Sequence, residues 1–276
     1  HSSADNPGDP VGWYAYRAGY TMAMNPKVTL SSERAPQGSI VAIQLSGILD
    51  GEPTVESDLG EVWFRKTATG YMGYLPVTYN AEGGDHTLQL TCGTLQKEIT
   101  LTVTRTLYDT VSVPAEEDVG GGEEFRNAIW PLYTTGSSAK LWNGRFEAPS
   151  AGAVSLAYGT TQMVDGQRSG QATGLTYAAA DGETVTAPQA GNIVFAGTLT
   201  LTGGTVVIDH GCGVKSYLYG LETVGVVRGQ SVSTGDPLGT AGMSHSLIYE
   251  LRIGSKSTDP QLALNGSSGL QFREAE

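Results

Sequence analysis

The chain has 276 residues, which suits two domains of ordinary size or one large one, and 39% of them are hydrophobic, enough for real cores. It carries 16 Lys and Arg against 28 Asp and Glu, for a formal net charge of −12. Affinity for nucleic acid depends on neutralising phosphates with Lys and Arg, so this balance argues against DNA or RNA binding. The 38 glycines and the long alternations of Thr, Val, Ile and Leu favour β structure.

The start of the chain indicates a fragment or a mature form, because the first residue is His1 and not Met. This is compatible with removal of a signal peptide or an anchor. No run of about 20 apolar residues is present, so any membrane association would depend on an anchor outside this sequence. Residues 1–27 are predicted to form an arm or short helix on a domain surface, through the aromatic residues Trp13, Tyr14, Tyr16 and Tyr20.

Residues 28–105 are predicted to form short strands separated by turns. At Val41, Ile43 and Leu45, period-two alternation directs one face inward and the other to water. The same pattern predicts strands around Val62 and Phe64, Leu88 and Leu90, and Ile99, Leu101 and Val103. Short strands at this spacing predict an antiparallel β-sandwich that resembles an immunoglobulin-like module in architecture only.

Residues 106–145 are predicted to connect this sandwich to a second domain. The run Val119-Gly-Gly-Gly-Glu-Glu is expected to flex or turn tightly. The rest is too apolar for a free linker, with Trp130, Leu132, Tyr133, Leu141 and Trp142. We therefore expect the connector to pack on one or both domains.

Residues 146–276 are predicted to form a second β-rich domain, so the fold class expected for the chain is all-β. Its clearest strands lie at 192–197, 204–211 and 246–252, separated by frequent glycines typical of tight hairpins. The two cysteines, Cys92 and Cys212, are expected in different domains. Two unpaired thiols are the simpler expectation, and a disulfide would need domain docking with suitable geometry.

Several segments of the second domain follow one another in a recognisable order. They include Gly174-Leu-Thr-Tyr-Ala-Ala, Val207-Ile-Asp-His-Gly-Cys-Gly213, Pro237-Leu-Gly-Thr-Ala-Gly242 and Tyr249-Glu-Leu-Arg252. In order and spacing these segments resemble peptidase family M23, the LytM or lysostaphin-type peptidases. The resemblance covers roughly residues 142–264 and implies a LytM-like antiparallel β domain.

In active members of that family, a His and an Asp four residues apart bind zinc, and a later His-x-His pair supplies the third ligand and a catalytic histidine. Zinc held this way lowers the pKa of a bound water towards 7, and a histidine takes its proton. Here Ala172, Thr176 and Ile248 stand at the ligand positions, and Gly220 and Ser246 at the helper histidines. Ala and Ile cannot bind zinc, and Thr and Ser are poor ligands, so no cofactor is expected.

A shift of register does not restore the site, because this domain has only the histidines His210 and His245 while the family site uses four. His245 stands one residue before the expected position, so its side chain is expected on the opposite strand face or before the strand. His210 is expected to hydrogen-bond locally. A non-standard metal site from His245, His210 and Asp209 stays open as an alternative. His86, after a turn in the first domain, is expected at the surface.

The resemblance and the missing ligands together predict a catalytically inactive, extracytoplasmic envelope protein, secreted or membrane-anchored. The groove is expected to persist, to be lined by Thr173, Tyr177, Tyr219 and His245, and to hold a peptidoglycan peptide or an envelope protein. Degenerate relatives imply a scaffold or a regulator of cell-wall hydrolases. Two alternatives are an active zinc-dependent cell-wall endopeptidase with a non-standard metal site, and a structural module with a filled groove and a large apolar patch elsewhere.

Overall fold

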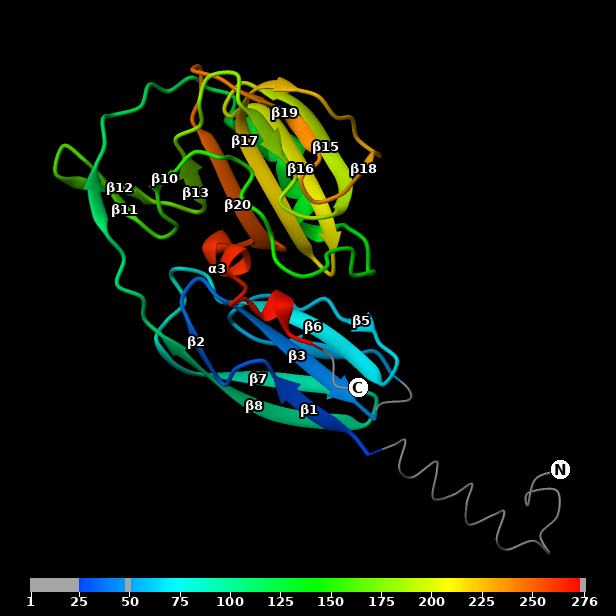
Figure 1. Ribbon diagram of the computed structural model, residues 1–276. Coiled ribbons are helices and arrows are strands. Elements are labelled where there is room, and N and C mark those ends of the chain that lie inside the picture. The colour runs from blue at the N-terminus through cyan, green and yellow to red at the C-terminus, as the bar shows by residue number, and fades with distance from the viewer. Residues whose placement is uncertain (1–24, 48–50, 274–276) are drawn as a thin grey trace, which may run out of the picture.

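The computed structural model describes residues 25–47 and 51–273, and strands dominate both of its domains (Figure 1). This confirms the all-β prediction. The predicted arm around Trp13 and Tyr20 lies outside the described residues. In the part of the chain that is described, no helix is long and apolar enough to cross a membrane.

The first domain consists of two four-stranded sheets, with strand orders β1–β3–β6–β5 and β2–β8–β7–β4. The strands are β1 (Lys27–Leu30), β2 (Arg34–Pro36), β3 (Ile40–Ser46), β4 (Thr54–Glu56), β5 (Arg65–Lys66), β6 (Gly70–Pro76), β7 (Gly84–Cys92) and β8 (Leu95–Thr104). The strand predicted around Val62 and Phe64 is wrong, because pairing begins only at Arg65. Both side chains instead press against Gly73, where a Cβ atom would lie 2.5 Å from Val62.

Strand β3 buries both of its faces, which corrects the prediction that one face meets water. Val41, Ile43 and Leu45 enter the core between the two sheets. Ala42 is fully buried on the other face, where it joins a core that includes residues of the second domain. The two domains therefore share a continuous apolar interface. Strand β7 behaves as predicted, with alternate residues buried and exposed.

Contacts between distant segments hold the two domains together, and helix α3 (Pro260–Asn265) lies between them (Figure 1). The rings of Tyr74 and Trp142 meet edge to face with centroids 5.0 Å apart. The backbone N–H of Asp259 donates to the carbonyl of Gly38 at 2.7 Å. Aromatic contacts of this kind add to the free energy of burying the apolar area itself.

The second domain is built on a sheet with the order β10–β13–β20–β17–β16–β15–β18, to which β14, β19 and β21 attach. Its elements are β10 (Val154–Leu156), β11 (Thr161–Val164), β12 (Gln167–Gln171), β13 (Leu175–Tyr177), β14 (Thr184–Thr186), β15 (Gly191–Leu199), β16 (Gly203–Gly211), β17 (Val214–Val224), β18 (Ser231–Val232), β19 (Pro237–Ala241), β20 (Leu247–Ile253), β21 (Lys256–Thr258), helix α3 (Pro260–Asn265) and the 3₁₀ helix η2 (Gly269–Gln271). Alternate residues serve two cores, as Leu218 and Tyr249 face the interdomain core while Tyr217 and Tyr219 face the opposite side.

The segment between the domains contains β9 (Thr110–Ser112), α2 (Gly122–Ile129) and the 3₁₀ helix η1 (Trp130–Thr134). Strand β9 pairs in parallel with β11. The α2–η1 segment packs on the outer sheet face, where Ile129 and partly buried Phe125 contact a cluster that includes Tyr217 and Tyr219. After it, the chain is held on the β16–β17 hairpin, where the Ser137 N–H donates to Asp209 Oδ2 at 2.8 Å.

Cys92 and Cys212 do not form a disulfide with each other. Cys92 is buried in the core between the two sheets of the first domain, whereas Cys212 is buried in the interdomain core. Burial raises the pKa of the Cys212 thiol to about 11, so the reactive thiolate form is disfavoured at neutral pH.

Candidate functional site

Two of the three positions that the sequence resemblance assigns to zinc ligands, Thr176 and Ile248, lie on the outer face of the second domain's sheet, while Ala172 lies between strands β12 and β13. Thr176 of β13 pairs directly with Ile248 of β20, and Ile248 pairs on its other side with Tyr219 of β17. The Ala172 N–H donates to the Thr160 carbonyl at 2.9 Å, and Ala172 is buried. The side chains in this row are therefore a hydroxyl at Thr176, a hydrocarbon at Ile248 and a phenol at Tyr219.

Gly220, at one of the two helper positions, sits in a β-bulge of β17. Tyr219 pairs with Thr205 and Leu221 with Gly204, which leaves Gly220 as an extra residue. Its φ is +85°, and a Cβ atom there would lie 2.0 Å from the carbonyl oxygen of Ser246. Ser246, the other helper position, is exposed and precedes β20. Any residue larger than glycine at position 220 would require the backbone to move.

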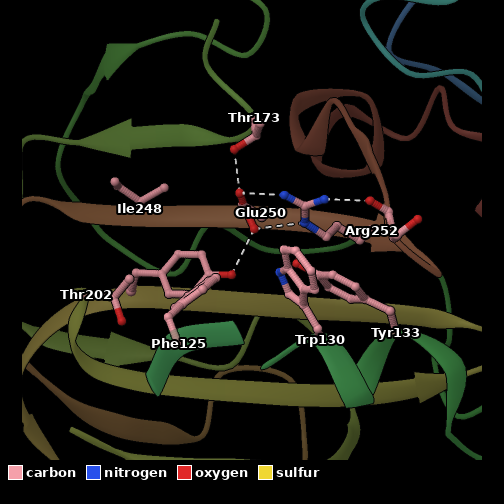
Figure 2. A pocket seen from close by; sticks show the side chains of 10 residues that line it. Phe125, Trp130, Tyr133, Thr173, Thr202, Ile248, Glu250 and Arg252 are labelled. Atoms are coloured by element: carbon pink, nitrogen blue, oxygen red, sulfur yellow. Dashed lines mark hydrogen bonds and ion pairs between the residues drawn. The ribbon is translucent and has the colours of Figure 1, made fainter. Parts of the chain in front are cut away.

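Next to this row lies a buried Glu250 whose carboxylate is fully hydrogen-bonded (Figure 2). Oε1 accepts from the Tyr219 hydroxyl and from Arg252 Nε, both at 2.9 Å. Oε2 accepts from the Thr173 hydroxyl and, at 3.0 Å, from Arg252 Nη2. A carboxylate offers about four lone-pair positions, so Glu250 has none left for a metal or a proton transfer.

Arg252 is fixed by partners on several sides. Besides its two bonds to Glu250, its Nη1 donates to the Ser255 carbonyl at 2.6 Å. Its guanidinium carbon lies 5.4 Å from the centre of the Tyr133 ring, a cation–π contact with η1. Burial alone would lower the pKa of Arg252, but the neighbouring Glu250 carboxylate raises it, so the guanidinium stays charged.

These residues line a cavity of about 630 Å³, called the aromatic cavity below, between the α2–η1 segment and the sheet. Its lining consists of Phe125, Trp130, Tyr133, Thr173, Thr202, Tyr219, Ile248, Glu250, Arg252 and Ser255. Of the predicted groove-lining residues, Thr173 and Tyr219 lie here. Tyr177 does not, because it alternates with Thr176 and points into the interdomain core. His245 does not either, because it lies in the exposed loop before β20.

Sequence reasoning missed the wall that the α2–η1 segment supplies. Phe125, Trp130 and Tyr133 face the sheet across the cavity (Figure 2). The apolar character of Trp130 and Tyr133 was the available signal, since it indicated packing on a domain. Which face they cover depends on contacts between residues far apart in the sequence, and periodicity does not report those contacts.

Comparison with known proteins agrees with this architecture. Residues 170–260 match the model of peptidase family M23. A crystal structure from Pseudomonas aeruginosa, described as a candidate M23 peptidase, superimposes with a TM-score of 0.63 at 19% sequence identity. The match covers 83% of this chain and 94% of that one. The C-terminal domain is an M23 domain.

Two other solved structures match less than half of this chain. The catalytic domain of lysostaphin from Staphylococcus simulans is 21% identical over 41% of this chain and 92% of its own, with a TM-score of 0.36. A structure of the SpoIIQ–SpoIIIAH pore-forming complex is 18% identical over 46% of this chain and 92% of that chain, with a TM-score of 0.39. Of these three structures, the Pseudomonas aeruginosa one alone covers more than half of this chain.

The donor set of this M23 domain does not fit a zinc ion. Ile248 offers no donor atom, Thr176 offers a neutral hydroxyl, and the adjacent Glu250 carboxylate is fully used. Zinc sites in proteins require thiolate, imidazole or carboxylate ligands. Across the described residues, no three His, Cys, Asp or Glu side chains are grouped so that they could hold a metal ion.

The alternative metal site built from His245, His210 and Asp209 is also wrong on geometry. The ring of His245 lies against Gly203, the first residue of β16. His210 stands seven residues further along the same strand, which is about 24 Å at roughly 3.4 Å per residue. Both oxygens of Asp209 accept backbone N–H bonds, from Ser137 at 2.8 Å and Gly211 at 2.9 Å.

His210 of the M23 domain is a structural residue held in its neutral form. Its Nδ1–H donates to the Ala190 carbonyl at 2.7 Å, so Nε2 accepts from the Ser216 hydroxyl, also at 2.7 Å. Ser216 in turn lies 3.0 Å from the Tyr249 hydroxyl. The expectation of local bonding was too narrow, since Ala190 is distant in sequence. Burial lowers the pKa of His210 to about 4.

Acidification is therefore expected to destabilise the protein through His210. In the unfolded chain histidine titrates near 6.5, so between about pH 6.5 and pH 4 the unfolded state binds the extra proton. The contribution to the free energy of unfolding is fully present above this window, falls as the pH falls through it, and totals about 3 kcal/mol. Urea unfolding at pH 7 and pH 4.5 measures the loss. His210→Gln should show a smaller loss, and an equal loss would contradict this assignment.

His86 corrects a second expectation, because it is buried and not at the surface. Its Nδ1 lies 2.9 Å from Asp58 Oδ1, and its Nε2 lies 2.6 Å from the Glu82 carbonyl. Burial opposes protonation, but the hydrogen bonds to Asp58 and Glu82 outweigh it and raise the pKa of His86. The residue ties a loop to the sandwich and lies outside the M23 domain.

Proposed function

We propose that this protein is a catalytically inactive, extracytoplasmic member of the M23 group that binds a peptide segment of the cell envelope without cleaving it. The segment belongs to peptidoglycan or to a protein partner, and the protein acts as a scaffold or as a regulator of wall hydrolases. One observation carries the proposal: Thr176 and Ile248 lie side by side at two positions that the resemblance assigns to zinc ligands, and the adjacent Glu250 carboxylate has no acceptor position left for a metal.

The chemistry of this set supports binding over catalysis. Hydrolysis of a peptide bond by this fold requires a polarised water and a base to take its proton. Here the nearest carboxylate is neutralised by Arg252, and no histidine lines the aromatic cavity. The site is stable without a metal, because each charge on Glu250 and Arg252 already has its partner.

The shape of the site supports a peptide as the ligand. The aromatic cavity is concave, mostly apolar, and carries a few polar groups at its floor, which is the usual composition of a binding site. Trp130 at its rim is 55% exposed although it is a large aromatic residue. Exposed tryptophan and buried arginine are the residue types that dominate binding energy at protein interfaces.

Metal analysis together with a cleavage and binding assay tests the proposal. The protein, dialysed after exposure to equimolar zinc, is expected to retain no stoichiometric metal and to release no peptides from purified peptidoglycan. It is expected to co-sediment with peptidoglycan or with an envelope protein partner, and Trp130→Ala to weaken that binding. One tightly held zinc per chain, or release of new amino termini from the wall, would overturn the proposal.

A further inference from the structure

The floor of the aromatic cavity presents spare hydrogen-bond donors beside a carboxylate that is already fully hydrogen-bonded. All lone-pair positions of Glu250 are occupied by Tyr219, Thr173 and Arg252. The Ser255 carbonyl already accepts from Arg252 at 2.6 Å. A ligand group that must donate a hydrogen bond would therefore find no free carboxylate here, only neutral hydroxyl and carbonyl oxygens.

Some hydrogen-bond donors at the floor of the aromatic cavity have no partner among the described residues. A guanidinium has five N–H groups, and Arg252 uses three of them, two on Glu250 and one on Ser255. The Tyr133 hydroxyl and the Trp130 indole N–H make no hydrogen bond to any described residue. Figure 2 shows Trp130 and Tyr133 beside Arg252, which is joined to Glu250 by hydrogen bonds. The polar end of the cavity thus suits a group that accepts hydrogen bonds.

The rest of the cavity is apolar and shaped for a side chain. Phe125 and Tyr219 lie 5.9 Å apart between ring centroids and form one wall. Ile248 continues this surface on β20, and Trp130 covers it from η1. The occupant should therefore combine an apolar side chain with a hydrogen-bond acceptor close to it, as an amino-acid residue within a peptide does.

Charge decides between the possible acceptors. Arg252 is already neutralised by Glu250, whose side chain is 7% exposed. A carboxylate ligand would place a second negative charge beside Glu250 in a poorly solvated site, which is unfavourable. A sugar would bring several hydroxyl donors, and the one carboxylate at the floor has no lone-pair position free for them. A backbone carbonyl accepts from Arg252 and adds no charge.

We infer that the aromatic cavity binds an uncharged internal segment of a peptide, with one apolar side chain against Phe125, Tyr219 and Ile248 and a backbone carbonyl on the spare N–H groups of Arg252. The inference rests on the proposed function and specifies its ligand. It excludes a free peptide C-terminus and a sugar as the groups recognised at this floor.

Titration of the full chain with three probes tests the inference. The probes are N-acetyl-leucyl-leucine amide, the same compound as its free acid, and methyl β-glucoside. The reporter is the indole N–H resonance of Trp130, assigned with Trp130→Phe. The blocked amide is expected to shift this resonance and to bind about tenfold more tightly than the acid, a difference of ~1.4 kcal/mol. The sugar is expected to cause no shift.

The outcomes of these experiments test the inferred ligand separately from the proposed binding function. Equal or tighter binding of the free acid, or binding of the sugar, overturns the inference and leaves peptide or envelope binding standing. If neither peptide shifts the resonance up to its solubility limit, that result contradicts both the inference and the proposed function. Co-sedimentation with an envelope partner that Trp130→Ala leaves unchanged would place binding outside the cavity and also overturn the inference.

Two variants connect the result to the named groups. Arg252→Lys keeps a positive charge beside Glu250 but reduces the donors from five to three, so the amide is expected to bind about tenfold more weakly. Trp130→Phe keeps an aromatic ring and should bind more tightly than Trp130→Ala, even if Arg252→Lys fails to fold; calorimetry measures binding for both, because neither variant has the indole reporter. Leu107→Ala, at a 98% exposed position outside the cavity lining, serves as the control and should bind like the wild type.

Discussion

Replacing Glu250 by alanine is expected to lower the free energy of unfolding by about 3–5 kcal/mol, the usual cost of removing one member of a buried ion pair. The Arg252 side chain is 14% exposed and would keep its charge with little water to solvate it. The Tyr219 and Thr173 hydroxyls would also lose their acceptor. Urea unfolding followed by circular dichroism measures the loss.

Control variants separate the cost of leaving Arg252 unpaired from the net contribution of the Glu250–Arg252 ion pair to stability. Glu98→Ala removes an exposed strand glutamate that accepts from Gln89 at 2.6 Å, and should cost less than about 0.5 kcal/mol. The double substitution Glu250→Leu with Arg252→Met removes both charges and should recover most of the loss. A Glu250→Ala loss as small as that of Glu98→Ala would show that water solvates the site.

The fold was predictable from sequence wherever one domain alone decides which side chains are buried. The alternation at Leu88 and Leu90 predicts β7 because one face of that strand meets solvent. Strand β3 shows the same alternation, yet Ala42 is also buried, because it joins a core that contains residues of the second domain. A small residue such as Ala42 is compatible with a buried or an exposed position, so the alternation pattern did not predict the interdomain interface.

The candidate site was also predictable from the sequence only in part. The resemblance to family M23 assigned Thr176 and Ile248 to zinc-ligand positions, where neither side chain is a suitable ligand, and strand pairing brings these two residues side by side. The role of Glu250 was not predictable, because its partners Tyr219 and Thr173 come from other parts of the chain. The bulge at Gly220 also escaped prediction, since a glycine in a strand is compatible with several local conformations.

Restoring the missing histidine at position 220 is expected to destabilise the protein by about 3 kcal/mol or more. A left-handed backbone costs an L-residue roughly 1–2 kcal/mol, and φ at Gly220 is +85°. The new Cβ atom would also lie 2.0 Å from the Ser246 carbonyl oxygen, so the β17–β20 pairing must shift and lose hydrogen bonds. Denaturant unfolding of Gly220→His against the wild type measures this cost.

Gly182→His separates backbone strain from the steric clash, because Gly182 has a φ of +80° but no atom within 4 Å of its Cβ position. It should cost only the roughly 1–2 kcal/mol of the left-handed conformation. Equal losses of unfolding free energy for the two variants would mean that the backbone at Ser246, before β20, moves at little cost. A larger loss at Gly220 means that the backbone itself excludes a histidine here. In that case the change from the family pattern includes main-chain geometry, and side-chain substitution at Ala172, Thr176 and Ile248 alone would not rebuild a peptidase.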